Sequence, residues 1–91
     1  MKLNIITFAA TALLIASGTV ASAAEVVVTQ KAKKFDQKKV TINKGDSIKF
    51  VNADSITHNI HSRGAGKFDL GAQKPNTAMT HVFAADGTFK I

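Results

Sequence analysis

The sequence predicts an all-β sandwich, and three observations lead to that class. Short runs of β-branched and aromatic residues alternate with polar residues at several places along the chain. Turn-forming Gly, Asn and Asp residues separate these runs. The only helix-like stretch lies in the first two dozen residues. The chain has 91 residues without an internal repeat or low-complexity linker, which is enough for one small domain.

The first 23 residues are predicted to be a signal peptide. Lys2 provides a short positive start, residues 3–16 form an apolar stretch, and Ala21-Ser22-Ala23 is an A-x-A cleavage pattern. The apolar stretch is shorter than the roughly 20 residues of a membrane-spanning helix. We expect cleavage after Ala23 or one residue later, with an uncleaved anchor as the alternative. The domain would then be residues 24–91, exported to the periplasm, without a membrane span.

Each strand of this domain is predicted from the same alternation. The predicted strands are residues 25–29, 40–42, 47–52, 56–61, 78–83 and 88–91. Asn43-Lys44-Gly45-Asp46 and Ala84-Ala85-Asp86-Gly87 are strong turn signals. Residues 63–76 are rich in Gly and polar residues, so we predict a long surface loop there. Phe68 and Leu70 are its expected anchors to the core.

Composition narrows the classes of function. There is no Cys, so disulfides are excluded. So small an exported domain would then depend for its stability on a metal site, or on a segment that is missing from this sequence. The formal net charge is +6, but the Lys residues are scattered and Trp and Tyr are absent, which argues against a nucleic-acid partner. Two interpretations of the charge stay open: a solubilising surface, or a basic face that steers docking onto an acidic partner. We expect a monomer.

Two histidines fall in one predicted strand. Side chains alternate between faces, so His58 and His61, three residues apart, should point in opposite directions and cannot chelate one ion. His58 shares the core face with Ile60, whereas Asn59 shares the outer face with His61. A buried imidazole needs a hydrogen bond or a metal at its ring nitrogens, so His58 is either a structural histidine or a ligand. His81 cannot be oriented from its pattern and is taken as structural.

Several stretches together resemble a known family. They are Phe35 with Val40-Thr41-Ile42, Lys44-Gly45-Asp46-Ser47-Ile48-Lys49-Phe50-Val51-Asn52, Thr57-His58-Asn59-Ile60, Phe68-Asp69-Leu70-Gly71, and Phe83 leading to Gly87-Thr88-Phe89-Lys90-Ile91. In order and spacing they resemble the cupredoxins, the plastocyanin- and amicyanin-like blue-copper proteins. The resemblance implies a Greek-key β-sandwich.

The resemblance also implies roles for particular residues. His58 would be the first copper ligand, and Asn59 would help to tie two ligand loops together by hydrogen bonding. The family's Cys is expected two places beyond Ile91, followed by a second His and an axial Met. A blue-copper centre needs two His and a Cys thiolate, so this chain alone lacks most of its ligands, and Met79 cannot replace the axial one. We therefore expect a fragment of a longer protein, without its last strand and with apolar surface and strand edges left open.

The function implied is electron transfer by copper cycling between Cu(II) and Cu(I) in the full-length parent, with a redox protein as partner. The alternative is a metal-independent, exported β-sandwich that serves as a binding or structural domain. An enzyme is not expected, because Ser55 or Ser62 beside His58 is a chance-level pairing and the carboxylates are scattered.

Overall fold

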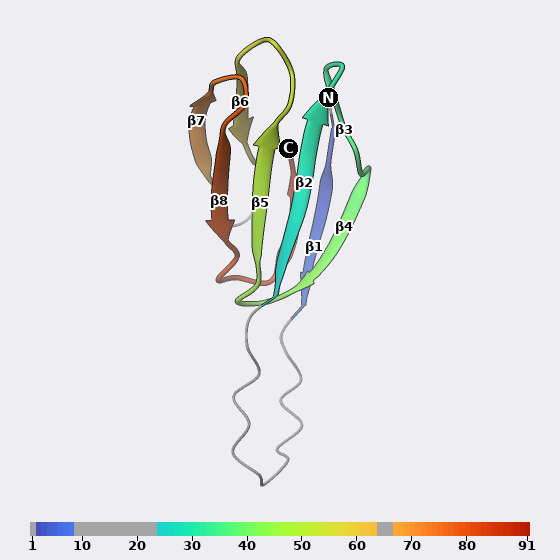
Figure 1. Cartoon of the computed structure of the whole chain (residues 1–91). Helices are drawn as coiled ribbons and strands as arrows, with labels where there is room; N and C mark the ends of the chain where they lie inside the picture. Colours follow the sequence, from blue (N-terminus) through green and yellow to red (C-terminus); the bar gives the residue numbers. More distant parts are fainter. Residues whose placement is uncertain (1, 9–23, 64–66) are drawn as a thin grey trace, which may run out of the picture.

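The structure, a computed structural model, describes residues 2–8, 24–63 and 67–91. Its strands, labelled in Figure 1, are β1 (Asn4–Phe8), β2 (Glu25–Lys31), β3 (Lys34–Phe35), β4 (Lys39–Asn43), β5 (Ser47–Asn52), β6 (His58–His61), β7 (Asp69–Gln73), β8 (Ala78–Val82) and β9 (Gly87–Lys90). The described residues contain no helix, which confirms the predicted all-β class. No helix in these ranges is long and apolar enough to cross a membrane.

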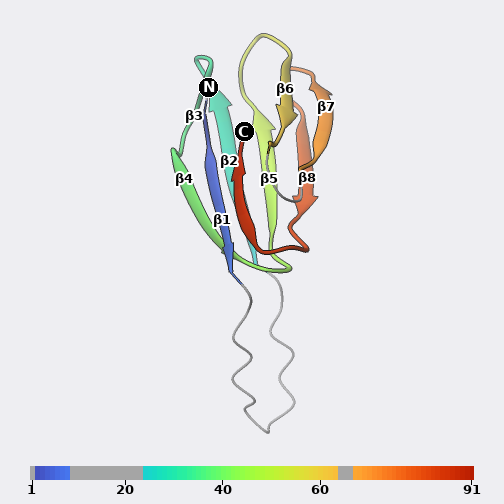
Figure 2. The same cartoon turned by 180° about the vertical axis from the view of Figure 1, so that it is seen from behind.

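The strands form two layers that face each other across the core. One layer is a sheet in the order β3-β2-β5-β8, in which β2 runs parallel to β5. The other contains the sheet β4-β1-β9, and the β6-β7 pair lies beside it (Figures 1 and 2). An isolated bridge between Arg63 and Lys90 connects the end of β6 to β9.

Alternating side chains from both layers fill the space between the sheets. In β5, Ile48 and Phe50 are fully buried while their neighbours are half-buried, as the period-two pattern predicted. Nine other buried apolar residues complete this core. Seven of them lie in strands, and Leu3 and Phe83 lie just outside a strand: Leu3, Ile5, Val28, Phe35, Val40, Ile42, Ile60, Phe83 and Phe89. Phe68 and Leu70 pack against this cluster, so their predicted role as anchors is confirmed.

The predicted turn before β5 forms and is held by a carboxylate. Asp46 is 8% exposed and accepts hydrogen bonds from the backbone N–H groups of Asn43 and Ala24, each at 2.9 Å. The same turn exchanges backbone hydrogen bonds with Phe83. Gly45 has a φ of 95°, a conformation that side-chain-bearing residues rarely adopt, which explains the glycine in this turn.

The N-terminal residues supply a strand that the sequence did not predict. β1 lies between β4 and β9, and the side chains of Leu3 and Ile5 are fully buried. β1 thus lies between the facing edges of β4 and β9, whereas the expectation of open strand edges and apolar surface concerned residues 24–91 without this segment and stays a prediction. The cleavage pattern Ala21-Ser22-Ala23 lies outside the described residues, so cleavage stays a prediction.

The predicted loop over residues 63–76 is also wrong in part. Asp69–Gln73 form β7, which pairs antiparallel with β6 through a register shift at Ile60 and His61. Gly71, with a φ of 74°, lies opposite Ile60 at this irregularity. The two-residue strand β3 was not predicted either. It pairs with the end of β2.

Candidate functional site

His58 begins β6, and the strand geometry sets its direction. Ile60 is fully buried and His58 is half-buried, whereas Asn59 and His61 are exposed. This is the alternation that the sequence predicted, with the two histidines on opposite faces. His58 and His61 therefore do not form a shared site.

A carboxylate fixes the imidazole of His58. Asp54 Oδ2 lies 2.5 Å from His58 Nε2, and only about a tenth of each side chain is exposed. The same carboxylate accepts backbone hydrogen bonds from Ala32, at 2.5 Å, and from Lys33, at 3.0 Å. The hydrogen bond from His58 is the main cause that lowers the pKa of Asp54, and the two backbone N–H groups add to it against a smaller opposing effect of burial.

The turn between β2 and β3 is shaped to present those N–H groups. Ala32 and Lys33 both have positive φ, at 52° and 59°, which is the backbone of a tight two-residue hairpin turn. Asp54 therefore connects three parts of the chain: this hairpin, the loop before β6, and His58. The sequence reasoning missed Asp54. Its spacing of four residues from His58 was visible, but its contact with the hairpin is tertiary.

A buried amide network supports the same end of the sandwich. Asn52 donates to the backbone oxygens of Ile56 (2.9 Å) and Gln73 (3.0 Å), and its own oxygen accepts from the Asp54 N–H (2.9 Å). Gln73 in turn accepts from Gln30 at 2.7 Å. All three amide side chains are almost completely buried. They hold the loop that carries Asp54 at a fixed distance from β5 and β7.

The hydrogen bond between Asp54 and His58 leaves one ring nitrogen of His58 for a metal. Nε2 is engaged by the carboxylate, so Nδ1 is the remaining ligand atom. A carboxylate on the second ring nitrogen is the usual support of a metal-binding histidine, because it fixes both tautomer and ring orientation. The arrangement can therefore present a single oriented nitrogen donor.

One donor does not make a copper centre. The chain has no Cys, and no group of three or more His, Cys, Asp or Glu that could hold a metal occurs within residues 2–8, 24–63 and 67–91. A blue-copper site requires two imidazoles and a thiolate around the ion. The residues present do not fit a complete copper site.

Of the other predicted residues, Asn59 lies on the opposite face of β6 from His58, and His81 lies in β8. The Asn59 side chain is exposed, and its predicted role in tying two loops together stays a prediction. His81 is half-buried in β8 and stacks on Phe68. Burial lowers the pKa of His81.

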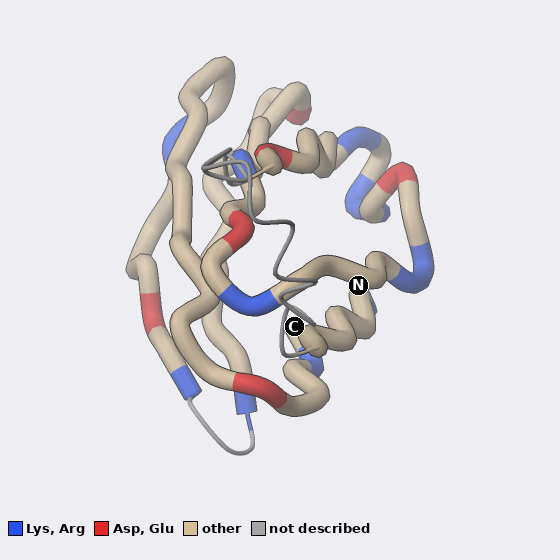
Figure 3. The backbone as a smooth tube through the Cα atoms, turned by 90° about the horizontal axis from the view of Figure 1, so that it is seen from below, with Lys and Arg blue, Asp and Glu red and all other residues tan. Residues whose placement is uncertain are grey.

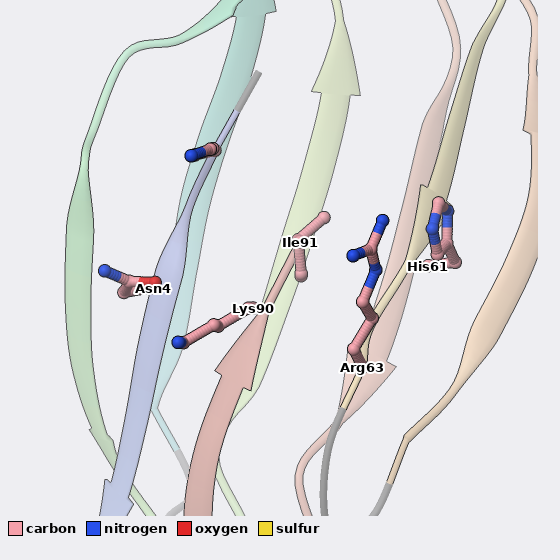
Figure 4. Close-up of a pocket in the computed structure, with 6 residues that line it drawn as sticks. Asn4, His61, Arg63, Lys90 and Ile91 are labelled. Carbon is pink, nitrogen blue, oxygen red and sulfur yellow. The ribbon is translucent and has the colours of Figure 1, made fainter.

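A basic pocket lies on the outer side of the β1-β9 pair. It has a volume of about 480 Å³ and is lined by Lys2, Asn4, His61, Arg63, Lys90 and Ile91. Figure 4 shows Arg63 between Ile91 and His61, and Lys90 extending to the side of Asn4. Three of the lining residues, Lys2, Arg63 and Lys90, carry permanent positive charges and none has an acidic side chain, so the pocket suits a negatively charged group. It does not include His58.

Fold and site together define a class: a β-sandwich that presents one carboxylate-oriented histidine at the start of a strand. Comparison with known families gives the family itself. The family described as copper binding proteins, plastocyanin/azurin family, matches residues 22–90, and the chain belongs to it. No curated protein and no solved structure gives a significant match.

Membership confirms the cupredoxin fold predicted from the sequence. The family binds copper, and its members are typically exported proteins that transfer electrons to redox partners. Copper is thus the cofactor that fits the family, whereas the residues that the structure describes do not by themselves supply a complete set of copper ligands.

Proposed function

We propose that this chain is part of an exported copper electron carrier and that His58 Nδ1 is one of the copper ligands. The observation that carries the proposal is the Asp54–His58 pair within a plastocyanin/azurin family match. The carboxylate fixes the ring so that a single nitrogen remains for the ion. No enzymatic activity is part of this proposal.

The remaining ligands are proposed to lie in a longer gene product. Support comes from the disagreement between family and ligand set: the family binds copper, yet the chain contains no Cys. Sequencing the gene or transcript through the codon for Ile91 tests this. We expect the frame to continue into a Cys, a His and a Met within a few residues of one another. A continuation with neither Cys nor Met would contradict the proposal.

The extended product offers a direct test of His58. A copper-loaded product should show the intense visible absorption of a Cu–thiolate bond, and His58→Gly should abolish or strongly change it. His61→Gly is the matched control, because His61 lies on the same strand but faces outward. An unchanged spectrum in His58→Gly would exclude His58 as a ligand.

Export is proposed on the leader pattern of Lys2, the apolar residues 3–16 and Ala21-Ser22-Ala23. We propose that the mature protein begins at Ala24 in the periplasm. Mass spectrometry of the protein isolated from its source tests this, with Ala24 or Glu25 expected at the N-terminus. A mature N-terminus at Met1 or Lys2 would contradict processing.

A basic surface is proposed to guide docking to an acidic redox partner. Figure 3 shows that Lys and Arg are spread around the sandwich with Asp and Glu between them, so the net charge of +6 is not gathered on one side. The pocket with Arg63 and Lys90 is the local exception. Binding of polyglutamate at low salt should weaken in Arg63→Glu and hardly change in Lys44→Glu. Equal effects would favour a merely solubilising surface.

The second candidate function is a metal-independent binding or structural domain, and the lack of Cys favours it. It predicts a stop codon directly after Ile91 and a soluble, folded product. The sequencing experiment separates the two candidates.

A further inference from the structure

We propose that Asp46 is the binding site for the N-terminal ammonium group of the processed protein, so that removal of the leader creates an ion pair between Ala24 and Asp46. The inference rests on the export proposed above and goes beyond it, because it assigns a partner to the new N-terminus. The site lies where β2 and β5 begin, at the end of the sandwich away from the start of β6 and His58 (Figure 1).

The carboxylate of Asp46 is nearly buried and has no cationic partner among the described residues. Asp46 is 8% exposed, and its two carboxylate oxygens accept from the backbone N–H groups of Asn43 and Ala24, each at 2.9 Å. Within residues 2–8, 24–63 and 67–91 the one ion pair joins Asp54 to His58, so none of the described Lys and Arg residues pairs with Asp46. A charge removed from water without a counter-charge is costly, so buried carboxylates are usually paired.

Processing would place a positive charge on a nitrogen that already contacts this carboxylate. Hydrolysis of the peptide bond between Ala23 and Ala24 consumes one water, leaves a carboxylate on Ala23 and turns the N–H of Ala24 into an ammonium group. An α-amine is mostly protonated at neutral pH. The Ala24 nitrogen lies 2.9 Å from Oδ1 of Asp46, and a hydrogen bond between two charged groups is stronger than one from a neutral N–H.

Both partners are held in place by hydrogen bonds that do not involve the residues before Ala24. The backbone oxygen of Ala24 accepts from the N–H of Ser47 at 3.0 Å. Asp46 donates its own N–H to the oxygen of Asn43 at 3.0 Å, and its backbone oxygen accepts from Phe83 at 2.9 Å. Ion pairs on a protein surface are weak partly because two flexible side chains must be ordered. Here the cation is a backbone nitrogen at a fixed position, so that cost is small.

The position of the carboxylate selects one of the two expected cleavage sites. If the mature chain began at Glu25, the ammonium group would lie about 3.3 Å further along β2. The Ala24 oxygen that accepts from Ser47 would also be lost. If the chain began upstream of Ala24, Asp46 would face a neutral amide. Only cleavage after Ala23 therefore places the charge at Oδ1.

The first test measures the reactivity of the new N-terminus in processed protein, expressed from the complete gene and isolated from the periplasm. Mass spectrometry identifies the N-terminus and follows trace acylation of its α-amine at neutral pH, with the exposed Lys44 as internal standard. Because an ion-paired ammonium group is seldom deprotonated, the Ala24 amine should react at least about fivefold more slowly in wild type than in Asp46→Asn. Asp36→Asn is the matched control and should keep the wild-type rate, because Asp36 accepts the N–H of Thr29 instead.

Two outcomes of this test would overturn the ion pair while leaving export intact. One is an Ala24 amine that reacts equally fast in wild type and in Asp46→Asn, and the other is a mature N-terminus at Glu25. An N-terminus at Met1 would overturn the ion pair together with the proposed export. The three results are distinguishable in one mass spectrum.

The second test moves the ammonium group and leaves every side chain of the domain unchanged. Inserting Gly-Ser between Ala23 and Ala24 keeps the cleavage pattern but moves the charge up to about 7 Å along the chain, so that Ala24 again offers a neutral N–H. The insertion should lower the urea midpoint of the processed wild-type protein and should not change that of processed Asp46→Asn. Equal shifts in the two backgrounds, or no shift in either, would overturn the ion pair, whatever the outcome for copper.

Discussion

The imidazole of His81 stacks on the ring of Phe68, with 3.8 Å between the ring centroids and 15° between the planes. Phe83 meets the same imidazole edge-on at 4.8 Å. His81 is thus part of an aromatic cluster, and a charge on it would be poorly solvated. This agrees with the structural role expected for His81 and explains why burial lowers its pKa.

Stability should consequently depend on His81 in mildly acidic solution. The folded state keeps the ring neutral below its ordinary pKa of 6.5, while the unfolded chain takes up a proton, so the free energy of unfolding should fall as the pH drops below 6.5. His81→Phe should flatten this part of the profile, since Phe retains the stacking. Urea midpoints measured from about pH 8 to about pH 5 test it. His61→Gln, on an exposed ring, should leave the wild-type slope intact, and an unchanged slope in His81→Phe would contradict the prediction.

Asp54 should produce a second pH dependence, at lower pH. Its pKa lies below the ordinary 3.8, so its stabilising effect is present above that value and is lost as the pH falls through the lowered pKa. Asp54→Asn should lower the denaturation midpoint at neutral pH and reduce the further loss in acid. Asp36→Asn is a suitable control, because Asp36 accepts a backbone hydrogen bond from Thr29 without touching a histidine. Equal acid profiles for both variants would argue against a special role of the His58 contact.

Neighbouring residues on β8 and just after it should differ sharply in their contribution to stability. Phe83 is 1% exposed and Val82 is 57% exposed. Phe83→Ala removes a large core side chain and should cost about 3–5 kcal/mol, whereas Val82→Ala should stay within about 0.5 kcal/mol of wild type. Urea unfolding provides both values. Comparable losses would mean that the strand faces are assigned incorrectly.

The amide of Asn52 should be needed for the loop that carries Asp54. Asn52→Ala leaves the oxygens of Ile56 and Gln73 without their donor and the Asp54 N–H without its acceptor. We expect a loss of about 1–3 kcal/mol in the free energy of unfolding. Amide hydrogen exchange at Asp54 should also accelerate. Asn59→Ala, at an exposed position, should change neither quantity, and the same neutrality in Asn52→Ala would contradict the network.

Local sequence patterns predicted those strands that are amphipathic by themselves. Residues 47–52 alternate clearly, and β5 has those same limits. β7 was missed because Asp69–Gln73 contain one large apolar residue and a Gly, and the strand exists through its pairing with β6. β1 was missed because apolar residues 3–16 match a leader better than a strand. Its inward positions become apparent only when β4 and β9 are placed on either side.

The sequence predicted the directions in which His58 and His61 point, but not the contacts that hold His58 in place. Strand alternation placed His58 inward and His61 outward. Asp54, the partner of His58, is held by a hairpin turn and a buried amide network, and neither has a local sequence signal. Gln30 and Gln73 are separated by 43 residues, yet their side chains meet at 2.7 Å. Such contacts follow from the packing of the layers, which a single sequence does not encode in any one stretch.

The reciprocal hydrogen bonds between Leu3 and Ile91 also constrain when the domain can fold. A chain synthesised from its N-terminus has β1 first and β9 last, so the sheet that contains both cannot close until residues 87–91 have been made. Contacts so distant in sequence close slowly, and an open edge persists until they form. Until those residues have been made, the edge of β1 that pairs with β9 has no partner within this sheet.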